Sequence, residues 1–156
     1  MNYRHHIDYE LYDDWQDLED RDVAMIKEAY SICEQAYAPY SKFKVGAIVL
    51  LEDGSIVRGN NQENMAYPSG LCAERVALFF AGANFPNLKV EALYIVAKGE
   101  LLNSSSLLSP CGACRQVMVE TEMRQKSDYK VFLVSENKKV IVFSSAKDLL
   151  PMAFGT

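Results

Sequence analysis

The chain has 156 residues, of which 49% are hydrophobic, with 8 glycines and 5 prolines. This length suits one globular domain, which would bury roughly two thirds of the surface of the unfolded chain. The formal net charge of −5 argues against a polyanionic partner. No stretch combines clustered lysine and arginine with aromatic residues, so the electrostatic signature of a nucleic-acid-binding protein is missing.

The apolar runs are short. The longest, at 45–51 and 76–83, fall far below the roughly 18 residues that a membrane helix requires. The start, "MNYRHHIDYELYDDW", lacks the apolar region of a secretory signal. We therefore expect a cytoplasmic protein with no membrane partner, in which thiols stay reduced. Its four cysteines are expected to be metal ligands or core residues rather than disulfides: Cys33, Cys72, Cys111 and Cys114.

Residues 1–16 are expected to form an acidic and aromatic arm without a core of its own, followed by a single domain at 17–156. Six acidic residues lie between positions 13 and 22, which suits the positive end of a helix dipole. Apolar residues then recur at steps of three and four, which predicts one helical stripe that ends before Pro39. The stripe consists of Val23, Ile26, Tyr30, Cys33 and Tyr37. Its position on this stripe makes Cys33 a core residue.

The middle of the chain alternates strand and helix patterns. Residues 45–51 and 55–58 predict a hairpin around a turn at Asp53 and Gly54. A second helix is expected at 72–83, a buried strand at 90–97, and a third helix at 112–125. The last two strands are expected at 129–135 and 139–143, before a short helical turn near Asp148.

This alternation predicts an α/β protein, a three-layer α/β/α sandwich around a mixed five-stranded sheet. The link between the last two strands, "ENK", is far too short for the crossover of a dozen or more residues that a parallel pair needs. These two strands are therefore expected to run antiparallel.

Three of the cysteines can meet at one point. Cys111 and Cys114 stand three residues apart at a helix start, and Cys72 stands at the start of another helix. Both positive helix ends stabilise thiolates, so together they favour a dication. Three sulfur ligands leave one tetrahedral position vacant, and a catalytic zinc keeps that position for water.

Two other interpretations remain open at this point. "PCGAC" resembles the redox pair of a thioredoxin, although such a pair has no use for a third cysteine. A structural zinc would need a fourth ligand, which Cys33, His5 or His6 would have to provide.

Glu74, two residues after Cys72, favours catalysis. In the first turn of a helix both side chains can reach a metal that lies near the helix axis. A carboxylate beside metal-bound water can accept a proton and deliver it to a ring nitrogen and to a leaving amine. The alternative is an acid placed in the first turn for its interaction with the helix dipole.

The C-A-E…P-C-x-x-C pattern resembles the zinc-deaminase signature. Four segments resemble, in order, the small homotetrameric cytidine deaminase family: "YAPYSKFKVGA", "NQENMAYPSGLCAERVAL", "SPCGACRQV" and "LLPMAF". The resemblance implies hydrolytic deamination of cytidine and 2′-deoxycytidine to uridine and 2′-deoxyuridine with release of ammonia, a reaction of pyrimidine salvage. It also implies one Zn²⁺ per subunit, bound by Cys72, Cys111 and Cys114, and Glu74 as the proton shuttle.

The same resemblance implies roles around the substrate. Asn61 and Glu63 would hydrogen-bond the ribose, and Phe43 would pack against the pyrimidine or the sugar. The backbone N–H of Ala73 would bind the base carbonyl, and the carbonyl of Ser109 would face the departing ammonia. In the family a tyrosine and a C-terminal phenylalanine reach into a neighbouring subunit's pocket, and Tyr67 and Phe154 occupy those positions.

A role for Arg75 beside the metal site follows from the charge of three thiolates. Three thiolates on Zn²⁺ leave a net negative charge, which weakens the pull of the metal on its water. A cationic donor close to the sulfurs withdraws part of that charge, and Arg75 directly follows Glu74. The alternative is an ordinary surface arginine.

Three rival functions can be weighed on the sequence. A deaminase of another aminonucleoside, such as a blasticidin-type substrate, would share the zinc motif, but "NQEN" and Phe43 favour ordinary pyrimidine nucleosides. The acidic charge and the short "ENK" link oppose a polynucleotide-editing deaminase. Glu74 and the vacant coordination position disfavour a non-catalytic zinc-binding module. The acidic arm and the "MAYPSGL" segment depart from the family pattern.

Overall fold

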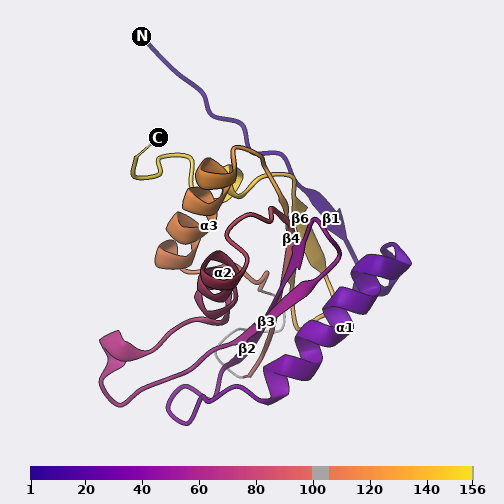
Figure 1. Cartoon of the computed structure of the whole chain (residues 1–156). Helices are drawn as coiled ribbons and strands as arrows, with labels where there is room; N and C mark the ends of the chain where they lie inside the picture. Colours follow the sequence, from indigo (N-terminus) through magenta and orange to yellow (C-terminus); the bar gives the residue numbers. More distant parts are fainter. Residues whose placement is uncertain (100–105, 156) are drawn as a thin grey trace.

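A single mixed sheet organises the computed structural model, which describes residues 1–99 and 106–155 (Figure 1). Within those residues the sheet has six strands in the order β1-β6-β5-β4-β2-β3. In chain order they are β1 (Glu10–Tyr12), β2 (Lys44–Leu51), β3 (Ile56–Asn60), β4 (Val90–Lys98), β5 (Lys130–Val134) and β6 (Val140–Phe143).

The sheet is mixed because one of its pairs is parallel. β4 and β5 run parallel, and the other four pairs run antiparallel. The predicted antiparallel pairing of the last two strands is confirmed, with Leu133 opposite Ile141. The short "ENK" connection allows no other arrangement.

In the described part of the chain, helices α1 (Asp20–Glu34), α2 (Ala73–Asn84) and α3 (Gly112–Gln125) cover the two faces of the sheet (Figure 1). Helix α1 packs on one face, while α2 and α3 cover the other. Short 3₁₀ turns are η1 (Trp15–Asp17), η2 (Tyr67–Ser69) and η3 (Ala146–Leu149). The predicted three-layer α/β/α sandwich is therefore confirmed.

Side chains of each strand contribute to two separate hydrophobic cores, because they alternate between the two faces of the sheet. On β2, Ala47 and Val49 face α2 and α3, whereas Ile48 and Leu50 face α1. Cys33 is fully buried in the α1 core, as predicted. Burial raises the pKa of its thiol to about 11, so it stays protonated.

Helix α1 ends three residues earlier than its apolar stripe predicts. The last helical residue is Glu34, and Tyr37 is half exposed outside the helix. The backbone of Tyr37 pairs instead with the segment after β3: its N–H donates to the carbonyl of Asn61 at 3.1 Å, and its carbonyl accepts from the N–H of Glu63 at 2.9 Å. This bridge, which the helical periodicity does not reveal, holds the chain after α1 against the segment after β3.

The N-terminal arm contributes the strand that the five-strand prediction missed. β1 pairs with the edge of β6, with Leu11 opposite Ile141. Trp15 is buried, and its ring lies 6.0 Å from that of Tyr30. A three-residue strand with two exposed side chains has no hydrophobic alternation that the sequence could show. The division of the chain at residue 16 stays a prediction.

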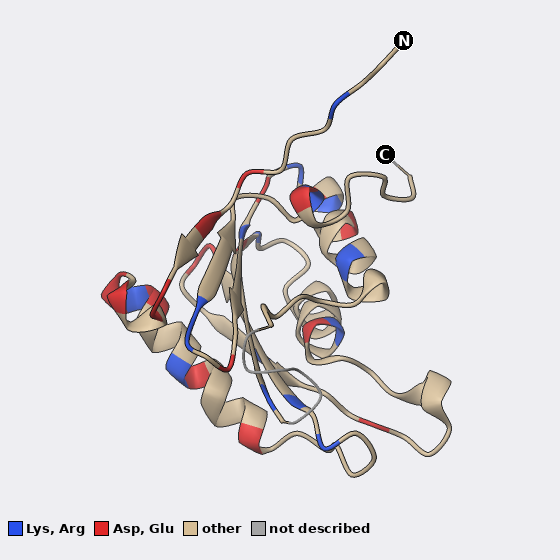
Figure 2. Ribbon diagram, turned by 180° about the vertical axis from the view of Figure 1, so that it is seen from behind, with Lys and Arg blue, Asp and Glu red and all other residues tan. Residues whose placement is uncertain are grey.

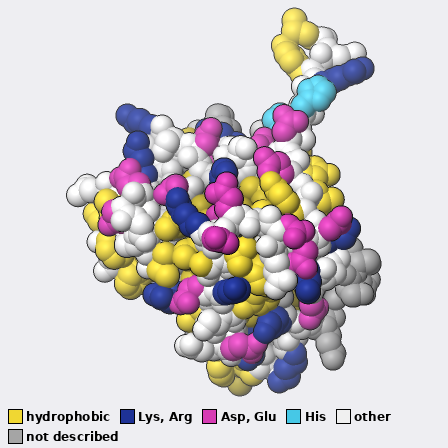
Figure 3. All heavy atoms as spheres, turned by 90° about the vertical axis from the view of Figure 1, so that its right-hand side faces the viewer, with side chains coloured by type: hydrophobic (Ala, Val, Ile, Leu, Met, Phe, Trp, Pro, Cys, Tyr) yellow, Lys and Arg dark blue, Asp and Glu magenta, His cyan; other side chains and the backbone are white. Residues whose placement is uncertain are grey.

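Charges of both signs are interspersed over the surface. Acidic and basic residues alternate along α1 (Figure 2). The face in Figure 3 shows no continuous patch of Lys and Arg, and the arm with both histidines projects from it. No helix in the described part of the chain is long and apolar enough to cross a membrane.

Gly59 on β3 lets the start of α2 approach the sheet closely. A Cβ atom at this position would lie 2.5 Å from the carbonyl oxygen of Ala73 and 2.7 Å from the backbone nitrogen of Ala77. Both atoms belong to the backbone of α2, so only a shift of the helix could make room. The position of the first turn of α2 therefore depends on a glycine here.

Replacing Gly59 by alanine should displace α2 and lower the free energy of unfolding by roughly 1–3 kcal/mol, the usual cost of overpacking a core. Thermal and denaturant unfolding measure this loss. Gly82→Ala in the same helix is the matched control, because its Cβ would meet nothing nearer than a side-chain nitrogen of Arg124 at 3.6 Å. Equal stability of the two variants would contradict the packing argument.

Candidate metal and active site

A cavity of about 290 Å³ opens beside the start of α2. Its walls come from the turn after α1, the segment after β3, η2 and the first turn of α2. The residues that line it are Tyr40, Asn61, Gln62, Glu63, Asn64, Tyr67, Gly70, Leu71, Cys72 and Arg75.

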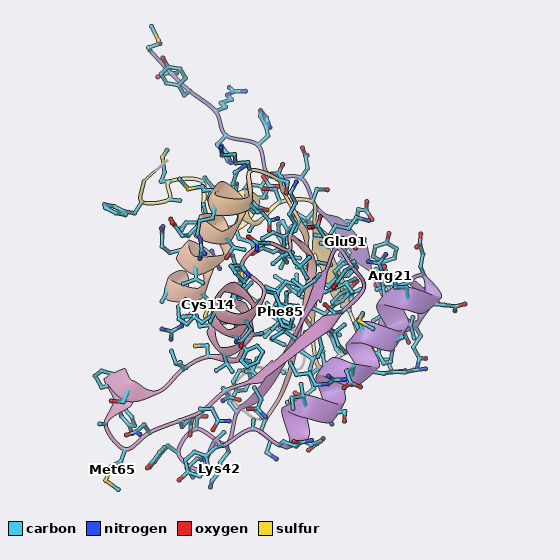
Figure 4. The ribbon with its side chains drawn as sticks, in the orientation of Figure 1. Arg21, Lys42, Met65, Phe85, Glu91 and Cys114 are labelled. Atoms are coloured by element: carbon cyan, nitrogen blue, oxygen red, sulfur yellow. The ribbon has the colours of Figure 1, made fainter. Side chains whose placement is uncertain are left out.

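The three predicted cysteine ligands come together where α2 and α3 begin, and one of them, Cys72, lines this cavity. Cys72 is the residue immediately before α2, and Cys111 is the residue immediately before α3. Cys114 follows one turn into α3 and lies between α3 and α2 (Figure 4). The sulfurs of Cys72 and Cys111 are 3.9 Å apart, those of Cys111 and Cys114 are 3.5 Å apart, and all three lie within 4.8 Å of one another.

These distances fit a tetrahedral zinc site. A Zn–S bond of about 2.3 Å places two sulfur ligands of a tetrahedron about 3.8 Å apart. Both flanking cysteines have extended backbone, and neither side chain caps its helix, so the sulfurs are free to converge on an ion. A third sulfur so close to Cys111 and Cys114 also argues against an isolated redox pair.

A fourth protein ligand is not found among the described residues that could hold a metal there. Cys33 lies in the core between α1 and the sheet, on the opposite face from α2 and α3. His5 and His6 lie in the exposed arm. The structure thus does not bring any of the three candidates for a closed structural site to the sulfurs.

Arg75 lies against the cysteine cluster. Its Nη2 donates to the sulfur of Cys72 at 3.6 Å. A hydrogen bond from Cys114 and this cationic contact lower the pKa of Cys72 to about 5, whereas donation to Cys72 and burial raise the pKa of Cys114. The Nε of Arg75 is buried and has no hydrogen-bond partner in the described residues. Such a cationic donor aimed at sulfur suits a negatively charged metal–thiolate cluster.

Glu74 is buried next to the sulfurs, with 5% of its surface exposed. Burial is the main cause that raises the pKa of its carboxyl to about 7, and the negative charge on Cys72 acts in the same direction. A carboxyl group that is in the first turn of a helix only to interact with the helix dipole would be expected at the surface. Glu74 is buried instead. The dipole explanation alone does not account for its burial.

The two predicted ribose ligands are already tied to the backbone around the cavity. The side-chain oxygen of Asn61 accepts from the N–H of Val45, and its amide donates to the carbonyl of Phe43, both at 2.8 Å. Glu63 accepts from the N–H of Tyr40 at 2.9 Å and from the hydroxyl of Ser41. Although burial acts to raise the pKa of Glu63, these hydrogen bonds lower it, so the carboxylate is ionised.

The structure does not bring every predicted residue to the cavity. Phe43 is half-buried and lines a separate small pocket with Leu108 and Ser135. Ala73 is the first helical residue of α2, and the N–H groups of the first turn have no partner within the helix. Tyr67 lines the cavity and is 76% exposed, while Phe154 is 87% exposed and lies outside the lining.

Other residues of the cavity were not singled out from the sequence. Tyr40, Gln62, Asn64 and Leu71 belong to its walls. All four lie within segments quoted above for their motifs, "YAPYSKFKVGA" and "NQENMAYPSGLCAERVAL". The motifs therefore contain these residues, but a loop has no periodicity from which to predict that a given side chain lines the cavity.

Comparisons with known proteins agree with this geometry. The family model described as "Cytidine and deoxycytidylate deaminase zinc-binding region" matches residues 19–127. The chain is 42% identical over 130 residues to a cytidine deaminase of Halalkalibacterium halodurans, which covers 83% of this chain and 91% of that relative. It is 35% identical to a probable cytidine deaminase of Dictyostelium discoideum, over 83% of this chain and 80% of that one.

Solved structures give the same result. The cytidine deaminase of Burkholderia pseudomallei superposes with a TM-score of 0.72 at 41% identity, covering 85% of this chain and 98% of that one. That of Mycobacterium tuberculosis gives a TM-score of 0.63 at 32% identity, with 86% and 97% covered. The family match spans the three cysteines and Glu74; of the predicted site residues, only Phe154 lies outside it. The converging sulfurs and the buried acid agree with this match. The chain therefore belongs to the cytidine and deoxycytidylate deaminase family.

Proposed function

We propose that the protein hydrolyses cytidine and 2′-deoxycytidine to uridine and 2′-deoxyuridine and releases ammonia. The observation that carries this proposal is the buried carboxyl of Glu74 beside three converging sulfurs, one of which, that of Cys72, belongs to a residue lining a cavity of small-molecule size. Family membership and the cytidine deaminases among its relatives support the same conclusion.

Cys72, Cys111 and Cys114 would hold one zinc ion per chain. Zinc supplies Lewis acidity that makes water nucleophilic near neutral pH. Glu74 would move two protons in turn, the first from the attacking water to N3 of the pyrimidine and the second from the resulting C4 hydroxyl to the departing amine. Arg75 draws negative charge from the Cys72 sulfur through its 3.6 Å contact and so keeps the metal electrophilic.

The walls of the cavity would orient the nucleoside. Glu63 accepts hydrogen bonds from Tyr40 and Ser41, and a carboxylate has about four acceptor sites, so it retains capacity for a ribose hydroxyl. Asn61 retains one amide hydrogen for the same hydroxyl. The N–H of Ala73 would donate to the base carbonyl, and the carbonyl of Ser109 would accept from the departing ammonia. Phe43 would contribute the apolar wall, which requires its ring to reach the substrate from the neighbouring pocket.

We also place the protein in the cytoplasm. All four cysteines are free thiols, and a site built from three sulfurs needs a compartment that keeps them reduced.

Glu74→Gln should keep the fold and the bound zinc but lower kcat by at least about a hundredfold, since an amide cannot carry the proton. Ultraviolet spectra recorded during incubation with cytidine, deoxycytidine, cytosine, adenosine and a blasticidin-type aminonucleoside measure turnover and test the substrate class. Glu91→Gln is the matched control, because Glu91 is a surface carboxylate paired with Arg21 at 2.6 Å (Figure 4). Near-normal turnover by Glu74→Gln would refute the assigned role.

A homotetramer with shared active sites is the assembly we propose. Its support is the exposure of large apolar side chains at the cavity, in the C-terminal segment and on α2. Tyr67 and Phe154 are largely exposed, and Phe79 and Phe80 expose about half of their surfaces. A groove of about 260 Å³ between α2 and α3 accompanies them. Large apolar side chains exposed beside a groove, as Phe79 is, are typical of a protein–protein contact surface.

Shared sites predict complementation between two variants of low activity. Phe154→Ala should lower kcat/KM by about tenfold or more, since the neighbouring pocket loses one wall. In tetramers assembled at random from equal amounts of Glu74→Gln and Phe154→Ala chains, one site in four would have an intact Glu74 and an intact neighbour. We therefore expect about a quarter of the wild-type activity after co-refolding.

Sedimentation measures the assembly itself, with about 70 kDa expected for four chains of 17.6 kDa. Activity in the mixture equal to the mean of the two separate variants would show that each site is built from one chain.

A further inference from the structure

The guanidinium group of Arg115 in α3 binds three acceptors in two separate segments. Its Nε donates to the carbonyl of Pro110 at 2.9 Å, and its Nη2 donates to the hydroxyl of Ser109 at 2.7 Å. Its Nη1 donates to the carbonyl of Leu149 at 3.0 Å, at the end of η3. The planar guanidinium holds these donors in a fixed fork, so the three acceptors are held in fixed relative positions.

The first two acceptors lie in the segment that leads to the metal site. Residues 106–110 have neither helix nor strand structure, and Cys111 follows them directly. The N–H of Leu108 also anchors this segment, because it donates to the hydroxyl of Ser135 at 2.8 Å. Pro110 has no N–H of its own to form a hydrogen bond. The path of the backbone from Ser109 to Cys111 therefore depends strongly on Arg115.

The third acceptor begins the C-terminal segment. Gln116, the next residue of α3, binds the backbone of Phe154 twice: its amide donates to the Phe154 carbonyl, and its oxygen accepts from the Phe154 N–H, both at 3.0 Å. The ring of Phe154 remains exposed while its backbone is held. Two consecutive side chains of α3 thus fix both ends of the segment from Leu149 to Phe154.

We propose that Arg115 is a positioning residue for deamination: it holds the Ser109–Cys111 segment in the register that presents the Ser109 carbonyl to the departing ammonia. By its third hydrogen bond it ties this register to the segment that carries Phe154. This inference rests on the proposed function, because that function assigns the Ser109 carbonyl its role. Arg115 itself lines no part of the cavity and has no assigned contact with the substrate.

Arg115→Lys tests the proposal in the zinc-loaded enzyme. Lysine keeps the positive charge, but its single nitrogen cannot reproduce the fixed fork that spans all three acceptors. We expect kcat per bound zinc ion to fall by about tenfold or more, since small displacements of reacting groups are costly, while KM for cytidine changes less than about threefold. Zinc content, kcat, KM and the midpoint of thermal unfolding are measured together.

Arg58→Lys is the matched control, because Arg58 on β3 forms a surface ion pair with Glu28 at 2.5 Å that lysine can keep. Ser109→Ala is the second variant: it removes one acceptor, leaves the guanidinium in place, and should lower kcat by a smaller factor of about three. Unchanged kcat per zinc ion in both variants, whatever happens to thermal stability, would overturn the proposal. If the wild type itself does not deaminate cytidine, the proposed function fails instead.

Discussion

Three cysteine sulfurs within 4.8 Å of one another form the arrangement on which the site depends. Thiolates at such short distances repel, so the surrounding structure must supply positive potential before a dication arrives. Two helix N-termini point at the cluster, and the guanidinium of Arg75 contacts the Cys72 sulfur. Glu74, which adds a buried acid to the same place, is tolerated because its proton is readily retained there.

The fold brings the cysteines together because the N-terminal ends of α2 and α3 lie side by side. α2 lies close on β3 because Gly59 has no side chain, and α3 enters from the loop that Arg115 secures. Only Cys114 is positioned by regular helix geometry, since Cys72 and Cys111 precede the first helical residue of α2 and α3. Precision at the metal site therefore comes from loop anchoring and from close packing on the sheet.

The chemistry of the site could be predicted from the sequence more completely than its walls. Spacing alone brings Cys111 and Cys114 together, and Glu74 follows Cys72 within one helical turn. The sixth strand could not be predicted, because β1 is held by backbone pairing and its side chains are largely exposed. The end of α1 was misplaced because Tyr37 fits the helical stripe but forms a bridge with Gln62. The position of Phe43 depends on packing between distant segments, which no local pattern encodes.

The pairing of β1 with β6 has a consequence for how the molecule behaves in concentrated solution. An uncovered outer strand offers its amide and carbonyl groups to any extended peptide, including the same strand of another molecule. Here three residues of the arm occupy that position, and the buried ring of Trp15 secures the arm just beyond them. Proteolysis between Tyr12 and Trp15 would free β1 to leave the sheet and expose the edge of β6, while the residues of the cavity stay in place. Aggregation in storage and loss of activity would then be separate events.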